Sequence, residues 1–176
     1  MNDDALQRLI SGYKTFYQEY AGEKYEDYRK GASLGQTPRI MIIACSDSRV
    51  NPSIVTGAKL GEIFIVCNVA NVVPPYRPEK GSHHSTSAAL EFAVHSLGIK
   101  TIVVMGHGKC GGIAAVVQDM SPLSKGDFIG KWMELITPAA AAVGPQHRYA
   151  NLREYLDHLE HESAIRTLDN LMTFPC

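Results

Sequence analysis

The sequence has no long apolar run and almost no excess of charge of either sign. A membrane-spanning helix needs about 18 or more consecutive apolar residues, and the chain contains no such run. The formal net charge of its 176 residues is −1, so nothing favours a nucleic acid or an anionic membrane as a partner. The N-terminus starts with acidic residues and lacks the apolar segment of a secretory signal. We therefore expect a cytoplasmic protein that binds neither nucleic acids nor membranes.

Cysteine is also scarce. The chain has four cysteines, at Cys45, Cys67, Cys110 and Cys176. Four thiols can pair as two disulfides, and the sequence alone does not exclude this. In a chain of this size without an export signal, reduced thiols are the better expectation, so metal binding or catalysis is considered first.

The rest of the composition is ordinary for a globular protein. Apolar residues make up 45% of the chain and charged residues 20%. The length suffices for one hydrophobic core, and there is no internal repeat, low-complexity tract or linker. We expect a single domain over residues 1–176, with an N-terminal helical arm over about residues 1–30.

Short apolar runs alternate with helical patterns along the chain. Three runs are typical of strands buried on both faces, at residues 39–45, 62–71 and 101–108. Helical patterns cover residues 4–21, 85–98, 110–120, 128–143 and 147–171. Strands separated by helices predict an α/β fold, with a mostly parallel central sheet that is flanked by helices.

The first apolar run leads directly into three chemically active side chains. Cys45, Asp47 and Arg49 follow at alternate positions in "ACSDSR". Alternate side chains of a strand share one face, so the three could project together if the strand conformation persists. Arg49 could then keep Asp47 ionised through a charge-assisted pair, because a neighbouring guanidinium lowers the pKa of a carboxyl group.

A second motif, "GHGKCGG", follows the third apolar run. It places His107 and Cys110 three residues apart, and a turn that opens into a helix would let both point at one atom. Both motifs lie beyond the carboxyl ends of predicted strands, where sites form in open α/β sheets. Two thiolates and one imidazole suit tetrahedral zinc, and three protein ligands leave one position open, as in catalytic zinc sites.

Each motif has a simpler explanation when taken alone. A cysteine at the end of an apolar run is usually a core residue, and an Asp-x-Arg pair is usually a surface pair. A glycine-rich turn before a helix can bind an anion instead. The occurrence of C-x-D-x-R and H-x-x-C together favours a metal site. In that site Asp47 could orient a reacting water, or bind the metal as a fourth ligand and close the site.

Longer segments resemble a bacterial β-class carbonic anhydrase. They are "ACSDSRVNPS", "NVANVVPPY", "SAALEFAVHSLGIKTIVVMGHGKCGGI" and "LMTFP", and the likeness runs from about residue 4 to the end of the chain. The resemblance implies reversible hydration of carbon dioxide to bicarbonate and a proton. It implies that Cys45, His107 and Cys110 bind zinc, and that Asp47 and Arg49 form a catalytic dyad.

The resemblance also implies substrate contacts and an assembly. Gln36 matches a glutamine that hydrogen-bonds the substrate in the family, and Gly111 matches a backbone amide that lines the same pocket. The family builds its site at a dimer interface, often assembles further into tetramers, and swaps N-terminal helices between subunits. We therefore expect a homodimer or homotetramer. His83 or His84 could carry the proton to solvent, although a solvated pair of loop histidines is the more ordinary explanation.

The sequence departs from the family pattern at two informative places. Cys67 stands where most members have an arginine, which in one subgroup helps to bind an inhibitory bicarbonate. We expect that regulation to be absent, and Cys67 to be a small buried residue. The chain also stops at "LMTFPC", where members usually continue with a helix and an edge strand. Without that segment, apolar surface and a sheet edge should be exposed.

Two other functions fit the same residues. A zinc hydrolase of a CO₂-like molecule, carbonyl sulfide or carbon disulfide, would use the same metal chemistry. A truncated, non-catalytic zinc-binding interaction protein would explain the short C-terminus. A redox role for Cys45 and Cys110 is disfavoured because the two are not in a C-x-x-C motif.

Overall fold

The computed structural model describes residues 3–78, 84–117 and 125–175. The chain divides into two compact units, Met1–Thr37 and Pro38–Cys176, which are treated separately. The single domain with an N-terminal arm therefore stays a prediction. Within the described ranges, no helix combines the length and the apolar character that crossing a membrane requires.

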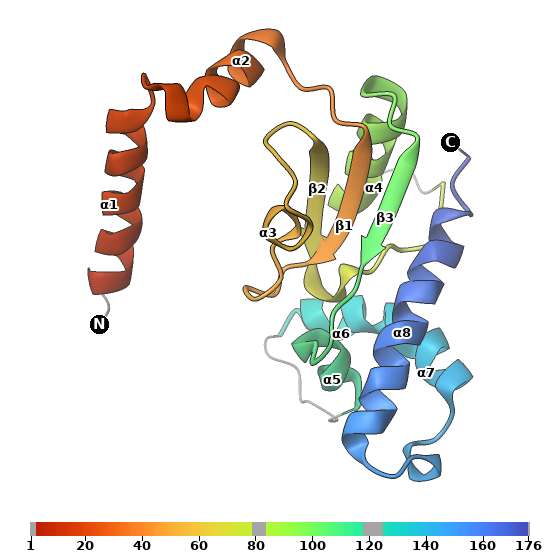
Figure 1. Cartoon of the computed structure of the whole chain (residues 1–176). Coiled ribbons are helices and arrows are strands. Elements are labelled where there is room, and N and C mark those ends of the chain that lie inside the picture. The colour runs from red at the N-terminus through yellow and green to blue at the C-terminus, as the bar shows by residue number, and fades with distance from the viewer. Residues whose placement is uncertain (1–2, 79–83, 118–124, 176) are drawn as a thin grey trace. The chain divides into compact units, whose positions relative to one another are not determined.

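The N-terminal unit is helical and carries a cluster of aromatic rings. Its elements are α1 (Asp3–Glu19), the short 3₁₀ turn η1 (Glu23–Tyr25) and α2 (Glu26–Leu34) (Figure 1). The helix predicted over residues 4–21 is confirmed. The rings of Tyr25 and Tyr28 lie edge-on to Phe16, with centroids 4.7 and 5.4 Å away. Aromatic pairs of this geometry hold α1 against the segment that follows it.

The second unit contains a parallel sheet of three strands, which confirms the predicted α/β class. They are β1 (Ile40–Cys45), β2 (Ile63–Asn68) and β3 (Thr101–Met105). The order is β2-β1-β3, with Ile40 opposite Ile63 on one side and Thr101 on the other. Because all three strands run in the same direction, the residues that follow them meet at one end of the sheet.

Burial on both faces was expected for all three strands and holds for β1 alone. Five of the six β1 residues are buried, whereas β2 and β3 are a mixture of half-buried and exposed residues. The reason is their position, since β2 and β3 are the edges of the described sheet and have a strand neighbour on one side only. The outer runs also end earlier than expected. After Asn68 the chain continues in a 3₁₀ turn, η2 (Val69–Asn71), and β3 ends at Met105.

The helices of this unit are shorter and more numerous than the sequence patterns suggest. Between the strands lie α3 (Pro52–Thr56) and α4 (Ser85–Glu91), which is continued by the π-helical turn η3 (Phe92–Ser96), and α5 (Gly111–Val117) follows the last strand. Those that follow are α6 (Phe128–Met133), η4 (Glu134–Ile136), α7 (Thr137–Val143), η5 (Gln146–Arg148) and α8 (Leu152–Leu171).

Two predicted long helices were wrong in detail. Residues 128–143 form three consecutive segments, because Pro138 lacks an N–H group and so starts a new helix rather than continuing the old one. The helix predicted from residue 147 begins at Leu152. There the Asn151 side chain accepts a hydrogen bond from the Glu154 N–H group at 3.0 Å, which caps the helix.

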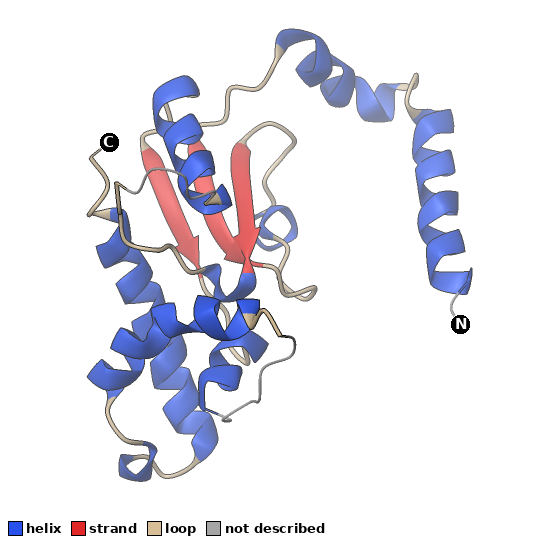
Figure 2. Ribbon diagram, turned by 180° about the vertical axis from the view of Figure 1, so that it is seen from behind, coloured by secondary structure: helices blue, strands red, loops and turns tan. Residues whose placement is uncertain are grey.

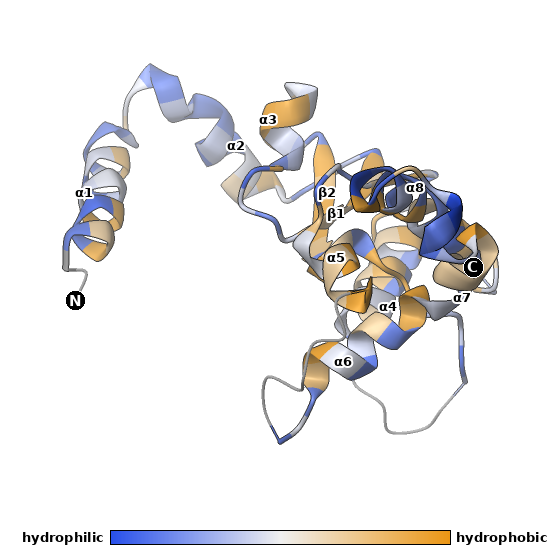
Figure 3. Ribbon diagram, turned by 90° about the horizontal axis from the view of Figure 1, so that it is seen from below, coloured by the Kyte–Doolittle hydropathy of each residue, from blue (hydrophilic) through white to orange (hydrophobic). Residues whose placement is uncertain are grey.

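Two apolar clusters hold the second unit together. One lies between the sheet and α4, which Figure 2 shows across one face of the strands; it includes Met41, Ile43, Leu90, Ala93 and Ile99. The other lies beyond the carboxyl ends of the strands, where α5, α6, α7 and α8 gather (Figure 1). The mostly hydrophobic colour of α5 in Figure 3 fits its place in this second cluster. That cluster also contains Cys45 and Cys110, so two of the predicted ligands belong to the core.

Candidate metal centre

Cys45 closes β1, and the chain turns immediately after it. The Cys45 side chain is buried, and its sulfur accepts a hydrogen bond from the Ala70 N–H group at 3.3 Å. The Val50 N–H group donates to the Asp47 carbonyl at 3.0 Å, which closes a tight turn over residues 47–50. The strand conformation therefore does not persist beyond Cys45. Asp47 and Arg49 are brought together by this turn and not by the two-residue period of a strand.

Arg49 holds the Asp47 carboxylate with two parallel hydrogen bonds. Its Nε lies 2.8 Å from Oδ1 and its Nη2 lies 2.6 Å from Oδ2. The Arg49 backbone N–H also donates to Oδ1, at 2.9 Å. These side-chain and backbone hydrogen bonds hold the pKa of Asp47 far below its usual range. The carboxylate is therefore ionised and fixed in direction, as the sequence predicted.

The second loop is a turn that opens into a helix. Lys109 has a φ angle of 58°, a left-handed conformation that costs a residue other than glycine about 1–3 kcal/mol. This reversal brings Cys110 to the start of α5, where its carbonyl accepts the Ala114 N–H at 3.0 Å. Arg49 Nη2 donates to the Lys109 carbonyl at 2.9 Å and so ties the two loops together.

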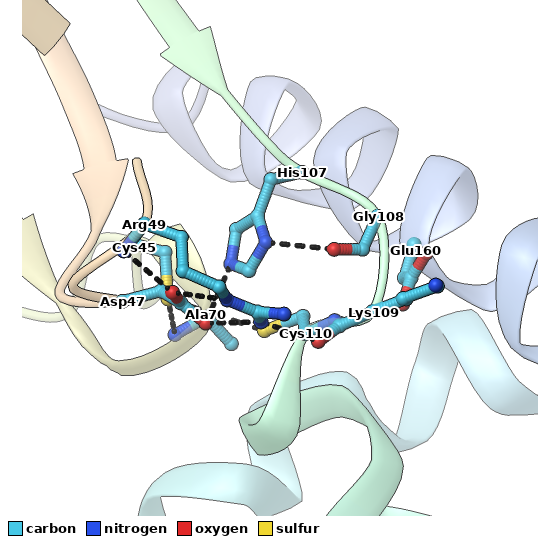
Figure 4. Close-up of polar contacts among 9 residues, drawn as sticks. All are labelled: Cys45, Asp47, Arg49, Ala70, His107, Gly108, Lys109, Cys110 and Glu160. Atoms are coloured by element: carbon cyan, nitrogen blue, oxygen red, sulfur yellow. Dashed lines mark hydrogen bonds and ion pairs between the residues drawn. The ribbon is translucent and has the colours of Figure 1, made fainter. Parts of the chain in front are cut away.

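Cys45, His107 and Cys110 meet between these loops (Figure 4). One ligand atom from each lies within 4.8 Å of the other two, and the two sulfur atoms are 3.9 Å apart. The predicted three-residue group is thus assembled. Asp47 lies beside it, with Oδ2 3.9 Å from His107 Nε2.

The His107 ring presents an unsatisfied nitrogen to this group. Its Nδ1 is 2.9 Å from the Gly108 carbonyl, so Nδ1 carries the proton and donates it. That tautomer leaves a lone pair on Nε2, which is buried and has no hydrogen-bond partner among the described residues. A buried polar atom without a partner is costly, and a metal ion is the partner that suits imidazole and thiolates together. The residues therefore fit a metal ion such as zinc.

The thiol chemistry agrees with this reading. Burial raises the pKa of Cys110 to about 11, so the thiol keeps its proton at neutral pH in the metal-free chain. A divalent cation would displace that proton, because thiolate is the form that binds metal.

Comparison with known proteins identifies the family. The family model described as carbonic anhydrase matches residues 40–176. This chain belongs to the β-class carbonic anhydrase family. β-Carbonic anhydrase 3 of Arabidopsis thaliana is 34% identical over 98% of the chain, and a carbonic anhydrase of Synechocystis sp. is 31% identical over 97%. The chain spans 66% and 61% of the length of these two relatives.

Solved β-carbonic anhydrases share the fold. The β-carbonic anhydrase CcaA superposes with a TM-score of 0.85 at 30% identity, over 97% of this chain and 75% of that one. One of two β-carbonic anhydrases from Sordaria macrospora, both described as tetrameric, superposes with a TM-score of 0.81 at 25% identity. That match covers 98% of this chain and 83% of the other.

The other residues singled out in the sequence lie at different distances along the chain from the Cys45–His107–Cys110 group. Gly111 is the first residue of α5, directly after Cys110. Gln36 belongs to the N-terminal unit, so its contact with substrate stays a prediction. His84 is an exposed residue that precedes α4, and His83 lies outside the described residues. Cys67 is exposed, so its expected burial was wrong, because β2 is an edge of the described sheet.

One residue at the centre was missed by sequence reasoning. Glu160 of α8 is 9% exposed, and its Oε1 accepts the Cys110 N–H at 3.0 Å. Its Oε2 lies 2.6 Å from Arg153 Nη2. A signal did exist in the sequence, since Glu160 interrupts the otherwise apolar or small buried stripe of α8, formed by Tyr155, Leu156, Leu159, Ser163 and Thr167.

Proposed function

We propose that this protein catalyses the reversible hydration of carbon dioxide to bicarbonate and a proton, with zinc as cofactor. The observation that carries the proposal is the grouping of Cys45, His107 and Cys110 beside an ionised Asp47 that Arg49 holds in place. Membership of the β-carbonic anhydrase family and the curated relatives named carbonic anhydrase support the choice of reaction.

The zinc would be held by the sulfur atoms of Cys45 and Cys110 and by Nε2 of His107. Bound there, zinc would supply a Lewis acid that brings the pKa of a water molecule toward neutrality. The chain's own contribution is the fixed position of the three donors. Cys45 is held by the Ala70 N–H, and His107 is held by the Gly108 carbonyl.

Asp47 would orient the water that attacks carbon dioxide. An ionised carboxylate only accepts hydrogen bonds, and its two oxygens keep acceptor sites beyond those that Arg49 occupies. By accepting a hydrogen bond from the attacking water, Asp47 would fix the direction of the oxygen lone pair. Because Arg49 fixes the direction of this carboxylate, we assign Asp47 the orienting role, with Arg49 as its anchor, in place of the role of a fourth metal ligand.

Substrate contacts and assembly complete the proposal. Gly111 lies in the first turn of α5, where N–H groups have no acceptor within the helix, so its N–H could donate to a substrate oxygen. The Gln36 side chain would be a second donor. We also propose a homodimer or homotetramer, supported by the relatives from Sordaria macrospora described as tetrameric. Exposed apolar residues of α1 agree with this, with Leu9 74% and Tyr17 69% exposed.

Stopped-flow measurement of carbon dioxide hydration on the zinc-loaded chain tests the proposal. We expect rapid hydration that is lost in the Cys110→Ala variant and retained in Cys67→Ala, whose thiol lies outside the ligand group. A folded, zinc-loaded chain that turns over carbonyl sulfide or carbon disulfide but leaves carbon dioxide unreacted would replace the proposed reaction. A loaded chain without any of these activities would refute an enzymatic function.

A further inference from the structure

The peptide group between Lys109 and Cys110 lies between two ion pairs. Its carbonyl accepts a hydrogen bond from Arg49 Nη2 at 2.9 Å, and its N–H donates to Glu160 Oε1 at 3.0 Å (Figure 4). Arg49 is paired with Asp47, and Glu160 is paired with Arg153. Because a peptide group is rigid and planar, a partner that fixes its N–H also fixes the direction of its carbonyl.

Glu160 is an unusual residue for the place that it occupies. Its side chain is 7% exposed, next to the fully buried Leu159 in the apolar stripe of α8. Carboxylates are rarely buried unless they are paired and hydrogen-bonded. Both conditions are met, and the backbone N–H that Glu160 accepts belongs to a proposed metal ligand.

We propose that Glu160 is a positioning residue for the metal centre, acting through the Lys109–Cys110 peptide group. The inference rests on the proposed zinc site. By holding the Cys110 N–H, Glu160 fixes the backbone from which the Cys110 thiol projects. Through the carbonyl of the same peptide group, it also fixes the acceptor that Arg49 needs.

The left-handed backbone conformation of Lys109 explains why the Lys109–Cys110 peptide group needs these hydrogen-bond partners. A residue other than glycine leaves this conformation unless its surroundings oppose the change, and leaving it requires rotation about the Lys109 N–Cα bond, which also turns the Lys109–Cys110 peptide group. That rotation would remove the hydrogen bonds of both Glu160 and Arg49. The Cys110 thiol would then lose its fixed direction toward Cys45 and His107.

Three variants separate the hydrogen bond from general stability. Glu160→Ala removes the acceptor and the charge. Glu160→Gln keeps a carbonyl oxygen that can accept the Cys110 N–H and removes the charge. Asn170→Ala is the matched control. It deletes a partly buried contact of the same helix, the hydrogen bond from Asn170 Nδ2 to the Val73 carbonyl at 2.8 Å, away from the metal centre.

The first readout is the zinc dissociation constant, from competition with a chromogenic chelator. Removing the support of a metal ligand typically weakens binding about 10–100-fold, and we expect Glu160→Ala to fall in that range. Glu160→Gln should recover most of the lost affinity, and Asn170→Ala should match the wild type. Equal affinities for Glu160→Ala and Asn170→Ala would overturn the inference, as would a Glu160→Gln variant as weak as Glu160→Ala.

The second readout needs neither metal nor turnover. Amide hydrogen exchange at Cys110 in the metal-free chain should be faster in Glu160→Ala and close to wild type in Glu160→Gln. Unchanged exchange at Cys110 in Glu160→Ala would overturn the inference. If Glu160→Ala does not fold, the Glu160→Gln variant decides: slow exchange at Cys110 supports the inference, and fast exchange overturns it. A wild-type chain that binds zinc without hydrating carbon dioxide refutes the proposed reaction and leaves this inference standing. A wild-type chain that binds no zinc overturns both.

Discussion

Replacing Cys110 with alanine should make the stability of the protein insensitive to zinc. Cys110 is 2% exposed, so without metal the variant loses only the burial of one sulfur atom, about 1 kcal/mol of the free energy of unfolding. With free zinc at about 100 times the dissociation constant, the wild type gains a further 2.7 kcal/mol or so by mass action. The gap between wild type and variant should therefore widen to about 4 kcal/mol when zinc is added.

Thermal unfolding in chelator and in zinc measures this difference. For a chain of this size, the zinc-dependent part corresponds to about 5–11 °C in the unfolding midpoint of the wild type. The Cys67→Ala variant is the matched control, because it makes the same substitution at an exposed thiol outside the ligand group. It should keep the full response to zinc. The ligand assignment is refuted if Cys110→Ala responds to zinc as strongly as the wild type.

Three further predictions follow from the same geometry. The Asp47→Asn variant should still bind zinc, because Asp47 is proposed as an orienting residue and not as a ligand. Its rate of carbon dioxide hydration in stopped flow should fall about 100-fold or more. An unchanged rate would show that Asp47 takes no part in the mechanism. Zinc binding at pH 7 should release protons, because the Cys110 thiol, with its pKa of about 11, must lose its proton to bind the metal; zinc affinity should therefore drop as the pH falls. A pH indicator in weakly buffered solution measures the released protons. Zinc binding without proton release would contradict this prediction. Gly112→Ala should lower the free energy of unfolding in urea by about 1–3 kcal/mol, because the added Cβ would lie 2.8 Å from Val69 Cγ1 and 3.2 Å from Ala70 Cβ. An unchanged free energy of unfolding would show that η2 moves to make room for the Cβ at no cost.

The ligand group could be predicted from the sequence because its members lie at or just beyond the ends of apolar runs. Parallel strands end at the same edge of a sheet, so Cys45 at the end of β1 and the His107–Cys110 turn after β3 were expected to lie close together. The α/β class followed from the same alternation of strands and helices. These features depend on short-range patterns that a single sequence carries.

Other features, or the reasons for them, could not be predicted from the sequence alone. The pairing of Asp47 with Arg49 was expected, but its cause was mistaken, because a two-residue period looks the same whether the chain continues as a strand or turns. Glu160 contacts an N–H group 50 residues away, and nothing local identifies that partner. The exposure of Cys67 follows from the position of β2 at an edge of the described sheet, which strand order decides and the apolar run does not.

The most direct test of the central claim is a titration of metal-free protein with zinc, followed by carbon dioxide hydration at each step. If Cys45, His107 and Cys110 hold the metal that supports the reaction, the rate rises in proportion to bound zinc and stops rising at one zinc per chain. Full occupancy without hydration, or a rate that does not depend on zinc, would contradict the account.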